Sequence, residues 1–337
     1  MDGSFSTQAL QAHLADKTDD GLALRRQRNG VRRALQRFRA NLESCSLCPR
    51  ACGVNRASGE RGYCRAGALA RVFRFGPHGG EEPPISGTGG SGTVFFAHCT
   101  MSCVFCQNYR FSQQDRGKEV SADELSEVFL SLQTAGCHNL NLVTPTHFLP
   151  QILEGLKMAF SGGFGLPIVY NTSSYENMDT IESLEGVVDI YLADARYADE
   201  RLAREYSGAA DYVVRSREAL KAMWDHSGQL ELDGEGIARK GLIIRHLVLP
   251  GHLKDTRRVL EWIAKGISTD VAVSLMGQYR PMHRAYGHRT LGRRLSLKEY
   301  DEALRFARSL DFETLFVQRP DSDFPADLLG EKMGSSW

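Results

Sequence analysis

The sequence lacks several features that would place it in particular classes of protein. Its 41 Lys and Arg residues are matched by 41 Asp and Glu residues, so no net charge points to a nucleic-acid partner. No apolar run approaches the roughly 18 residues of a membrane span. The first residues, Met1–Leu14, also lack the basic start and apolar run of a signal peptide. We therefore expect neither a membrane contact nor export, and a nucleic-acid partner is not indicated.

Cysteine is absent after residue 137 and concentrated before it. Of the eight cysteines, seven fall within 62 residues. A secreted chain with this pattern would favour disulfides, whereas closely spaced cysteines in a reducing compartment more often bind metal or carry out redox chemistry. Because the start shows no export signal, we expect a cytoplasmic protein whose thiols bind metal. The eight are Cys45, Cys48, Cys52, Cys64, Cys99, Cys103, Cys106 and Cys137.

The chain from residue 93 onward alternates short apolar runs with helical patterns, and this alternation predicts an α/β fold with a parallel sheet, open or curled into a barrel. Most runs are continuous and β-rich, as in buried parallel strands. The predicted strands are Thr93–Ala97, Asn139–Val143, Ile168–Asn171, Val187–Ala193, Leu242–Leu249, Val271–Met276 and a weaker Thr314–Gln318. Capping boxes at Ser121 and Ser296 open helices, and the patterns at Leu149–Phe160, Met178–Leu184, Tyr212–Asp225 and Thr256–Lys265 predict others.

We divide the chain into four segments. Residues 1–43 combine a polar stretch with a basic helix over 23–43, whose apolar residues share one side. Residues 44–92 hold a first cysteine group and a Gly/Pro-rich connector, interpreted as a flexible approach to the barrel. Residues 93–320 form the strand–helix repeat, and 321–337 form a C-terminal tail. The basic helix is interpreted as docked by its apolar side, and contact with RNA or a partner protein is the alternative.

The second cysteine group directly follows the first predicted strand. Cys99, Cys103 and Cys106 have the spacing C-x3-C-x2-C. Three thiolates on one short loop can hold three irons of a 4Fe–4S cube and leave the fourth iron free to chelate a small molecule. Zinc is the alternative, but a structural zinc needs four ligands and the triplet offers three, with only His98 beside it.

This loop resembles the cluster loop of the radical S-adenosylmethionine (SAM) superfamily, in which an aromatic residue also precedes the last cysteine. The chain is most similar to the branch around pyruvate formate-lyase-activating enzyme, and within it to uncharacterised relatives with an extra N-terminal cysteine motif. The resemblance covers roughly residues 45–310. It includes segments at successive strand ends, which are Asn141–His147, Tyr170–Glu176, Asp189–Asp194, Ile244–Gly251 and Leu275–Tyr279.

The resemblance implies a partial (β/α)6 barrel with its site at the C-terminal ends of the strands. It implies that Cys99, Cys103 and Cys106 bind a 4Fe–4S cluster whose open iron holds SAM. One electron then cleaves SAM to a 5′-deoxyadenosyl radical, which abstracts hydrogen from a protein or small-molecule substrate. A glycyl-radical enzyme is the named protein candidate, and a low-potential donor such as flavodoxin or ferredoxin is expected. Because the cofactor carries the chemistry, no catalytic side chain is assigned.

By the same resemblance, several residues face the cofactor. Phe105 takes the position near the adenine, and Asn171, Asp194 and Arg245 lie at strand ends, with Arg196 two residues after Asp194. The segment 144–147 stands where the family usually carries Gly-Gly-Glu, so no carboxylate is expected there. For each polar residue, a structural hydrogen bond or ion pair is the alternative.

The first cysteine group offers four thiols, Cys45, Cys48, Cys52 and Cys64, with the spacing C-x2-C-x3-C-x11-C. Four thiols are enough for a closed site, which is either a second iron–sulfur cluster or a structural zinc that folds a loop-rich cap. Cys137 adjoins a predicted buried strand and is interpreted as a core residue. The competing hypothesis for the whole chain is a metal- or iron–sulfur-binding scaffold that contacts RNA or a protein through the basic helix.

Overall fold

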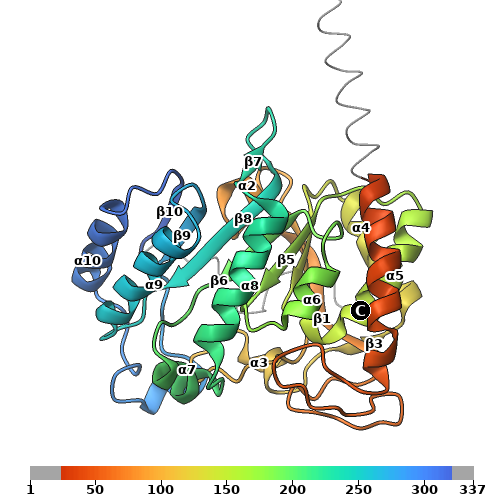
Figure 1. Cartoon of the computed structure of the whole chain (residues 1–337), viewed down its shortest axis with the longest axis horizontal. Helices are drawn as coiled ribbons and strands as arrows, with labels where there is room; N and C mark the ends of the chain where they lie inside the picture. The colour runs from red at the N-terminus through yellow and green to blue at the C-terminus, as the bar shows by residue number, and fades with distance from the viewer. Residues whose placement is uncertain (1–23, 321–337) are drawn as a thin grey trace, which may run out of the picture.

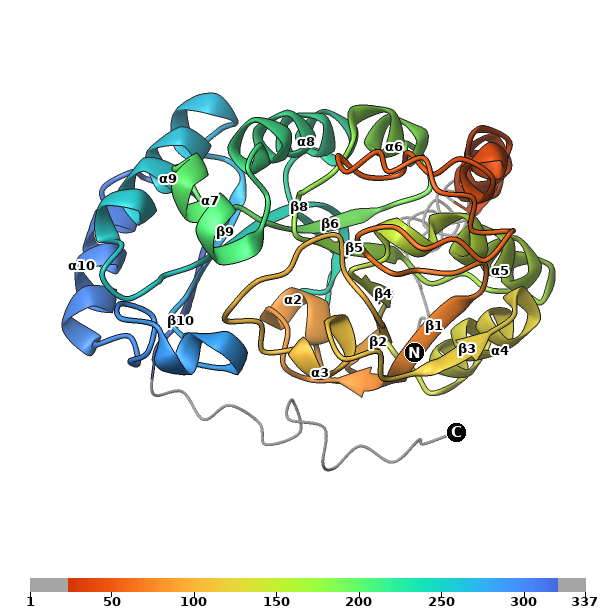
Figure 2. The same ribbon diagram turned by 90° about the horizontal axis from the view of Figure 1, so that it is seen from below.

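The fold centres on one large curved sheet. The computed structural model describes residues 24–320, so the polar stretch at 1–22 and the tail at 321–337 lie outside the described residues. The strands follow the order β10-β9-β8-β6-β5-β4-β2-β1-β3, and β7 pairs with β8. Helices surround the outside of the curve, and α2 and α3 lie on its inner side (Figures 1 and 2).

Seven neighbouring strands run parallel and in chain order, so each crossover leads to the next strand of the sheet. This is the arrangement of a partial barrel, because β2 and β10 stand far apart in the sheet order and do not close it. All seven predicted strands are confirmed. They are β2 (Ser91–Phe96), β4 (Leu140–Val143), β5 (Ile168–Thr172), β6 (Ile190–Asp194), β8 (Ala238–Leu247), β9 (Ala272–Met276) and β10 (Leu315–Gln318).

The predicted helices connect these strands. Both capping boxes form: the Ser121 side chain accepts from the backbone of Glu124, and Ser296 does the same with Glu299. The helix Glu200–Ser207 and several short helical turns were not predicted. The crossover helices are α4 (Ala122–Thr134), α5 (Leu149–Ser161), α6 (Met178–Ser183), α7 (Glu200–Ser207), α8 (Tyr212–Ser227), α9 (Leu253–Gly266) and α10 (Leu297–Arg308); the short elements are α2 (Pro83–Ser86), α3 (Tyr109–Ser112), η1 (Arg39–Leu42), η2 (Thr146–Phe148) and η3 (His283–Gly287).

Three antiparallel strands extend the sheet beyond the sequence prediction. β1 (Ala70–His78) pairs with β2 and with β3 (Lys118–Val120), and the two-residue β7 (Glu231–Leu232) pairs with β8. The connector expected over 76–92 is ordered rather than flexible, because it contains the end of β1 and the whole of α2. This segment folds back against the inner side of the barrel and supplies residues to the site (Figure 2).

The N-terminal basic helix covers residues 24–38 and packs beside α5 and α6 (Figure 1). Val31, Ala34 and Phe38 are buried, which confirms the predicted apolar docking side. Arg28 also donates from Nη2 to the Phe160 carbonyl oxygen at 2.9 Å. Across residues 24–320, no helix has both the length and the apolar character that crossing a bilayer requires.

Candidate functional site

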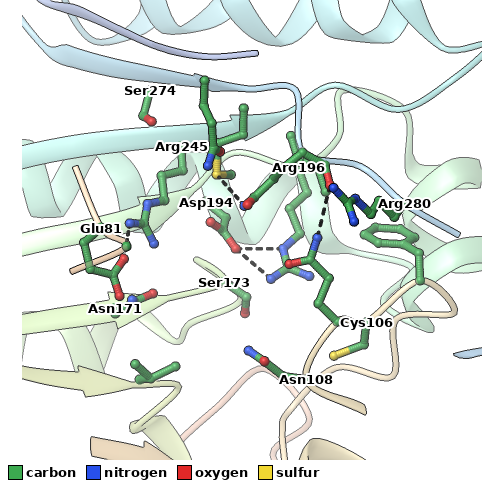
Figure 3. A pocket seen from close by; sticks show the side chains of 18 of the residues that line it. Glu81, Cys106, Asn108, Asn171, Ser173, Asp194, Arg196, Arg245, Ser274 and Arg280 are labelled. Carbon is green, nitrogen blue, oxygen red and sulfur yellow. Dashed lines mark hydrogen bonds and ion pairs between the residues drawn. The ribbon is translucent and has the colours of Figure 1, made fainter. Parts of the chain in front are cut away.

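A cavity of about 900 Å³ opens at the C-terminal ends of the parallel strands (Figure 3). Because parallel strands all end at the same edge, polar residues distant in sequence meet there. Val143, Asn171, Asp194 and Ser274 each come from a different strand and line this cavity. The loop after β2 contributes Phe105, Cys106 and Asn108 to the opposite wall.

The predicted cluster loop is held by backbone contacts with the end of α7. Ser102 donates from its N–H to the Ser207 carbonyl oxygen at 3.1 Å, and Val104 donates to that of Tyr206 at 2.8 Å. Cys106 donates to the Cys103 carbonyl oxygen at 3.2 Å, which closes a turn between two of the three cysteines. The structure therefore brings the triplet onto one compact loop with Cys106 facing the cavity.

Two of the three thiols lie where burial disfavours the free thiolate. Burial, with the neighbouring Cys103 as the second cause, raises the pKa of Cys99 to about 12 and that of Cys106 to about 11. Free thiols at Cys99 and Cys106 would therefore stay protonated, whereas a metal centre stabilises thiolates. Cys103 Sγ accepts from Arg196 Nη1 at 2.9 Å and from Ser207 Oγ at 3.0 Å.

Among the described residues, no three Cys, His, Asp or Glu side chains are placed to bind one metal ion. A 4Fe–4S cube does not need such convergence, because each thiolate binds a different iron. The donor set of three mutually close thiols with a guanidinium beside them therefore fits an iron–sulfur cluster better than it fits mononuclear zinc.

Asp194 and Arg196 form a half-buried pair that orients the guanidinium. Arg196 donates from Nε and Nη2 to Asp194 Oδ2 at 3.0 and 2.6 Å, and its Nη1 remains for Cys103. Tyr212 donates its hydroxyl to the Asp194 carbonyl oxygen at 3.0 Å, so the strand end is fixed as well. Asp194 lines the cavity as predicted, and its carboxylate is committed to Arg196.

Arg245 also lines the cavity, but its guanidinium is already paired. It donates from Nε to Glu82 Oε1 at 2.9 Å and from Nη2 to both Glu81 and Glu82. Burial alone would raise the pKa of Glu82, but the charge of Arg245 and the hydrogen bonds from Arg245 and Ser274 together outweigh burial and lower it. Arg245 therefore forms a buried ion triad with Glu81 and Glu82, which is the structural ion pair given as the alternative for this residue; Figure 3 shows Arg245 beside Glu81.

Glu81 and Glu82 were missed by sequence reasoning. They lie in the connector immediately before α2, and the Glu-Glu-Pro-Pro run was the available signal, because Pro83 begins a helix with Glu82 as its N-cap. Glu81 additionally accepts from Asn141 Nδ2 at 3.2 Å. These two carboxylates enter the barrel from a segment that was predicted to be only a connector.

Phe105 and Asn171 both line the cavity wall. Phe105 contacts the Tyr279 ring edge to face, with centroids 5.9 Å apart. In the segment 144–147, Thr144 lines the cavity, while Thr146 donates to the buried carboxylate of Glu176 at 2.7 Å. A carboxylate thus supports this loop from behind and does not reach the cavity.

The first cysteine group lies in a cap, residues 44–69, that contains no helix or strand. Cys45, Cys48 and Cys64 are buried and Cys52 is exposed. The cap is fixed to α6, because Thr180 donates from Oγ1 to the Leu47 carbonyl oxygen at 2.8 Å. Cys137, outside both groups, is buried in the core as predicted.

Comparisons with known proteins give distant similarities. No protein-family model matches the chain. An uncharacterized protein of Methanocaldococcus jannaschii is 29% identical over 286 residues, which are 81% of this chain and 77% of that protein.

Among solved structures, the chain is similar to Streptococcus suis SuiB bound to S-adenosylmethionine, with 12% identity and a TM-score of 0.47 over 66% of this chain. It spans about half of SuiB, 48%. It is also similar to a radical SAM methyltransferase from Sphaerobacter thermophilus, with 12% identity and a TM-score of 0.48 over 67% of this chain and 66% of that one. Methylornithine synthase (PylB) gives 15% identity and a TM-score of 0.44 over 68% and 72%. These values do not assign an activity.

Proposed function

We propose that this chain is a radical SAM enzyme in which Cys99, Cys103 and Cys106 bind a 4Fe–4S cluster and the cavity beside them binds SAM. The observation that carries the proposal is the position of the triplet: three thiols on one loop at the strand ends, with Cys106 and Phe105 forming part of the cavity wall. When bound and reduced, the cluster would supply the electron that cleaves SAM and so starts hydrogen abstraction from a substrate.

The protein's own residues would hold and shield this chemistry. Arg196 and Ser207 donate to Cys103 Sγ and stabilise its thiolate. Phe105 offers an apolar surface for a flat ring, and Asn171 offers a polar group on the facing strand end. Each of these side chains would bind or orient the cluster or SAM, and no general base is needed.

The substrate is proposed as a class. Hydrogen abstraction requires only that a C–H group reach the cavity, so a protein segment, such as that of a glycyl-radical enzyme, and a small molecule are the two candidates. Reduction of the cluster needs a low-potential donor, for which flavodoxin or ferredoxin in the cytoplasm is proposed.

The test is reductive cleavage of SAM. Protein reconstituted anaerobically with iron and sulfide and reduced with dithionite should release 5′-deoxyadenosine, measured by liquid chromatography. The triple variant Cys99→Ala, Cys103→Ala, Cys106→Ala should release none, and Cys137→Ala, which alters a core thiol outside the site, should retain the activity. A fully loaded protein that leaves SAM intact, with and without candidate substrates, would overturn the proposal.

The contacts of the basic helix argue against the alternative that the chain is a scaffold for RNA or a partner protein. Arg28 and Arg37 point to the barrel and donate to the Phe160 carbonyl oxygen at 2.9 Å and the Ser183 hydroxyl at 3.4 Å. Arg33 donates at 3.4 Å to the Glu185 carbonyl oxygen. These three arginines therefore hold the helix against its own protein. RNA binding by the full chain in a filter-binding assay would support the scaffold alternative.

A further inference from the structure

The N-terminal cap places a buried cation beside two of its four thiols. Arg56 is 2% exposed and donates from Nη2 to Cys45 Sγ at 2.9 Å and to Cys64 Sγ at 3.7 Å. Its Nη1 donates to the His147 carbonyl oxygen, and its Nε is buried without a hydrogen-bond partner. The charge of Arg56 thus faces sulfur and one carbonyl group, and no ion pair to a described carboxylate accompanies it.

A buried guanidinium requires a compensating negative charge. In this cap the sulfur atoms are its neighbours, so the compensation comes from thiolates. Four thiolates around either Zn²⁺ or an oxidised 4Fe–4S core leave a net negative charge, and both would neutralise Arg56. The geometry around Arg56 therefore points to a metal-bound, anionic cysteine site, independently of the cysteine spacing.

Two arginines of the cap connect it to the loop that carries the other cysteine triplet, Arg50 directly and Arg56 through His147. Arg50 donates from Nε to the Thr100 carbonyl oxygen at 3.2 Å, and Thr100 directly follows Cys99. Arg56 donates to His147, whose Nε2 lies 2.7 Å from the carbonyl oxygen of Ala97 at the end of β2. Both cysteine groups are thus joined through short series of hydrogen bonds and covalent bonds.

The two groups also share one electrostatic feature. Arg56 Nη2 lies 2.9 Å from Cys45 Sγ, and Arg196 Nη1 lies 2.9 Å from Cys103 Sγ. Hydrogen bonds to sulfur and nearby charge set the reduction potential of an iron–sulfur cluster. A matching donor on each group favours similar potentials, which electron exchange between two clusters needs and a structural zinc does not.

We propose that Cys45, Cys48, Cys52 and Cys64 bind a second 4Fe–4S cluster that relays electrons to the triplet's cluster through the Arg50–Thr100 contact. Cys52 is the exposed thiol of the group and marks the side where the electron enters. This relay role rests on the proposed function, whereas the presence of the second cluster does not.

The relay moves one electron at a time. A reduced low-potential flavoprotein or ferredoxin loses one electron and reduces the cap cluster. The cap cluster is then reoxidised as it passes that electron to the triplet's cluster. No proton or bond is exchanged in either step, and the electron is consumed when SAM is cleaved.

The first experiment determines what the cap binds. The triple variant Cys99→Ala, Cys103→Ala, Cys106→Ala removes the triplet and leaves the cap's four cysteines. After anaerobic reconstitution of the full-length variant, we expect about four iron and about four sulfide per chain, and an electron paramagnetic resonance signal of a reduced 4Fe–4S cluster. One zinc and no sulfide per chain, or no metal at all, would overturn the proposal.

The second experiment tests the relay. The double variant Cys45→Ala, Cys48→Ala should keep the triplet's cluster signal and its direct reduction by dithionite, because this small reductant can enter the cavity. Its reduction by reduced flavodoxin, followed by stopped-flow absorbance, should slow at least about 10-fold. Equal flavodoxin rates in variant and wild type would overturn the relay.

A single substitution outside the cysteines tests the relay even if the double variant loses both clusters. Arg50→Met keeps every cysteine and removes the contact with Thr100, and the exposed Arg61→Met is its matched control within the cap. Flavodoxin-driven reduction should slow in the first variant only, and no difference between the two would overturn the relay. Failure of SAM cleavage in a protein that holds both clusters would instead count against the proposed function, so the two failures are distinguishable.

Discussion

Arg196 donates to Cys103 Sγ from Nη1 at 2.9 Å while its other face is held by Asp194. The side chain thus connects a strand end of the barrel to the proposed cluster loop. A charged hydrogen bond to a thiolate is worth more than a neutral one, so this contact should influence how easily the cluster is reduced.

Replacing Arg196 by Lys should lower the reduction potential of the triplet's cluster and slow SAM cleavage about 10-fold or more. Lys keeps the charge but cannot bind Asp194 and Cys103 together, because it lacks the planar fork. Arg201→Lys is the matched control, since Arg201 pairs with Asp199 at the same sequence spacing and its side chain is 87% exposed. Redox titration followed by electron paramagnetic resonance, together with 5′-deoxyadenosine release, checks the prediction. Equal titration curves for both variants would contradict it.

Removing the charge of Arg245 should destabilise the fold strongly. Arg245→Met leaves Glu81 and Glu82 buried without their cation, and a broken buried pair costs about 3–5 kcal/mol. Arg257→Met, which breaks the more exposed pair with Glu302, should cost less than about 1 kcal/mol. Urea unfolding measures both.

A rescue variant separates charge from packing at the same position. Adding Glu81→Gln and Glu82→Gln to Arg245→Met removes the uncompensated charges and should restore part of the lost stability. A triple variant as unstable as Arg245→Met alone would show that packing of the guanidinium dominates there.

The contribution of Asp189 to stability should fall as the pH rises from about 4 to about 7. Burial raises the pKa of Asp189 to about 7, and the hydrogen bonds from Ile168 and Gln27 offset burial only in part. The unfolded carboxyl titrates near 3.9. Between these two pKa values the native state binds more protons than the unfolded state. The stability that Asp189 contributes is therefore complete below the pKa of the unfolded carboxyl, and it is lost as the pH rises through the pKa of the folded one.

Asp189→Asn should remove this contribution, so between pH 5 and pH 8 its free energy of unfolding should change in the stabilising direction relative to wild type, while the contribution of Glu176, whose pKa burial also raises to about 7, stays in both proteins. Free energies of unfolding in urea at pH 5 and pH 8 give the comparison. Asp225→Asn, at an exposed position of α8, is the control and should leave the wild-type slope unchanged. An unaltered slope in Asp189→Asn would show that this carboxyl stays ionised.

Gly62→Ala should disrupt the cap's metal site. A Cβ at Gly62 would lie 2.5 Å from Cys52 Sγ, so that thiol has to move. Gly67→Ala is the matched control in the same cap, because its Cβ would meet only Arg61 Nη2 at 3.5 Å. Metal and sulfide content per chain, measured after removal of the triplet, should fall by at least half in the first variant and stay unchanged in the second. Full loading of Gly62→Ala would place Cys52 outside the ligand set.

The parallel core could be predicted because each of its strands carries its own signal. Strands such as β2 and β4 are buried along their whole length, so they read as continuous apolar runs. The capping boxes at Ser121 and Ser296 are equally local, since the bonds join residues three apart. β1 escaped prediction because half of its residues are only partly buried and Arg71 and Arg74 interrupt the apolar pattern.

By itself, the sequence determined the composition of the two cysteine groups, the strand–helix repeat and the location of polar residues at strand ends, because these depend on spacing along the chain. Only the tertiary structure decided which groups the buried charges meet. Arg245 lies 163 residues from the carboxylate of Glu82, and Arg56 lies 91 residues from His147, whose carbonyl oxygen accepts a hydrogen bond from it. Such pairs arise when the connector and the cap fold onto the barrel, and burial then obliges each charge to find a partner.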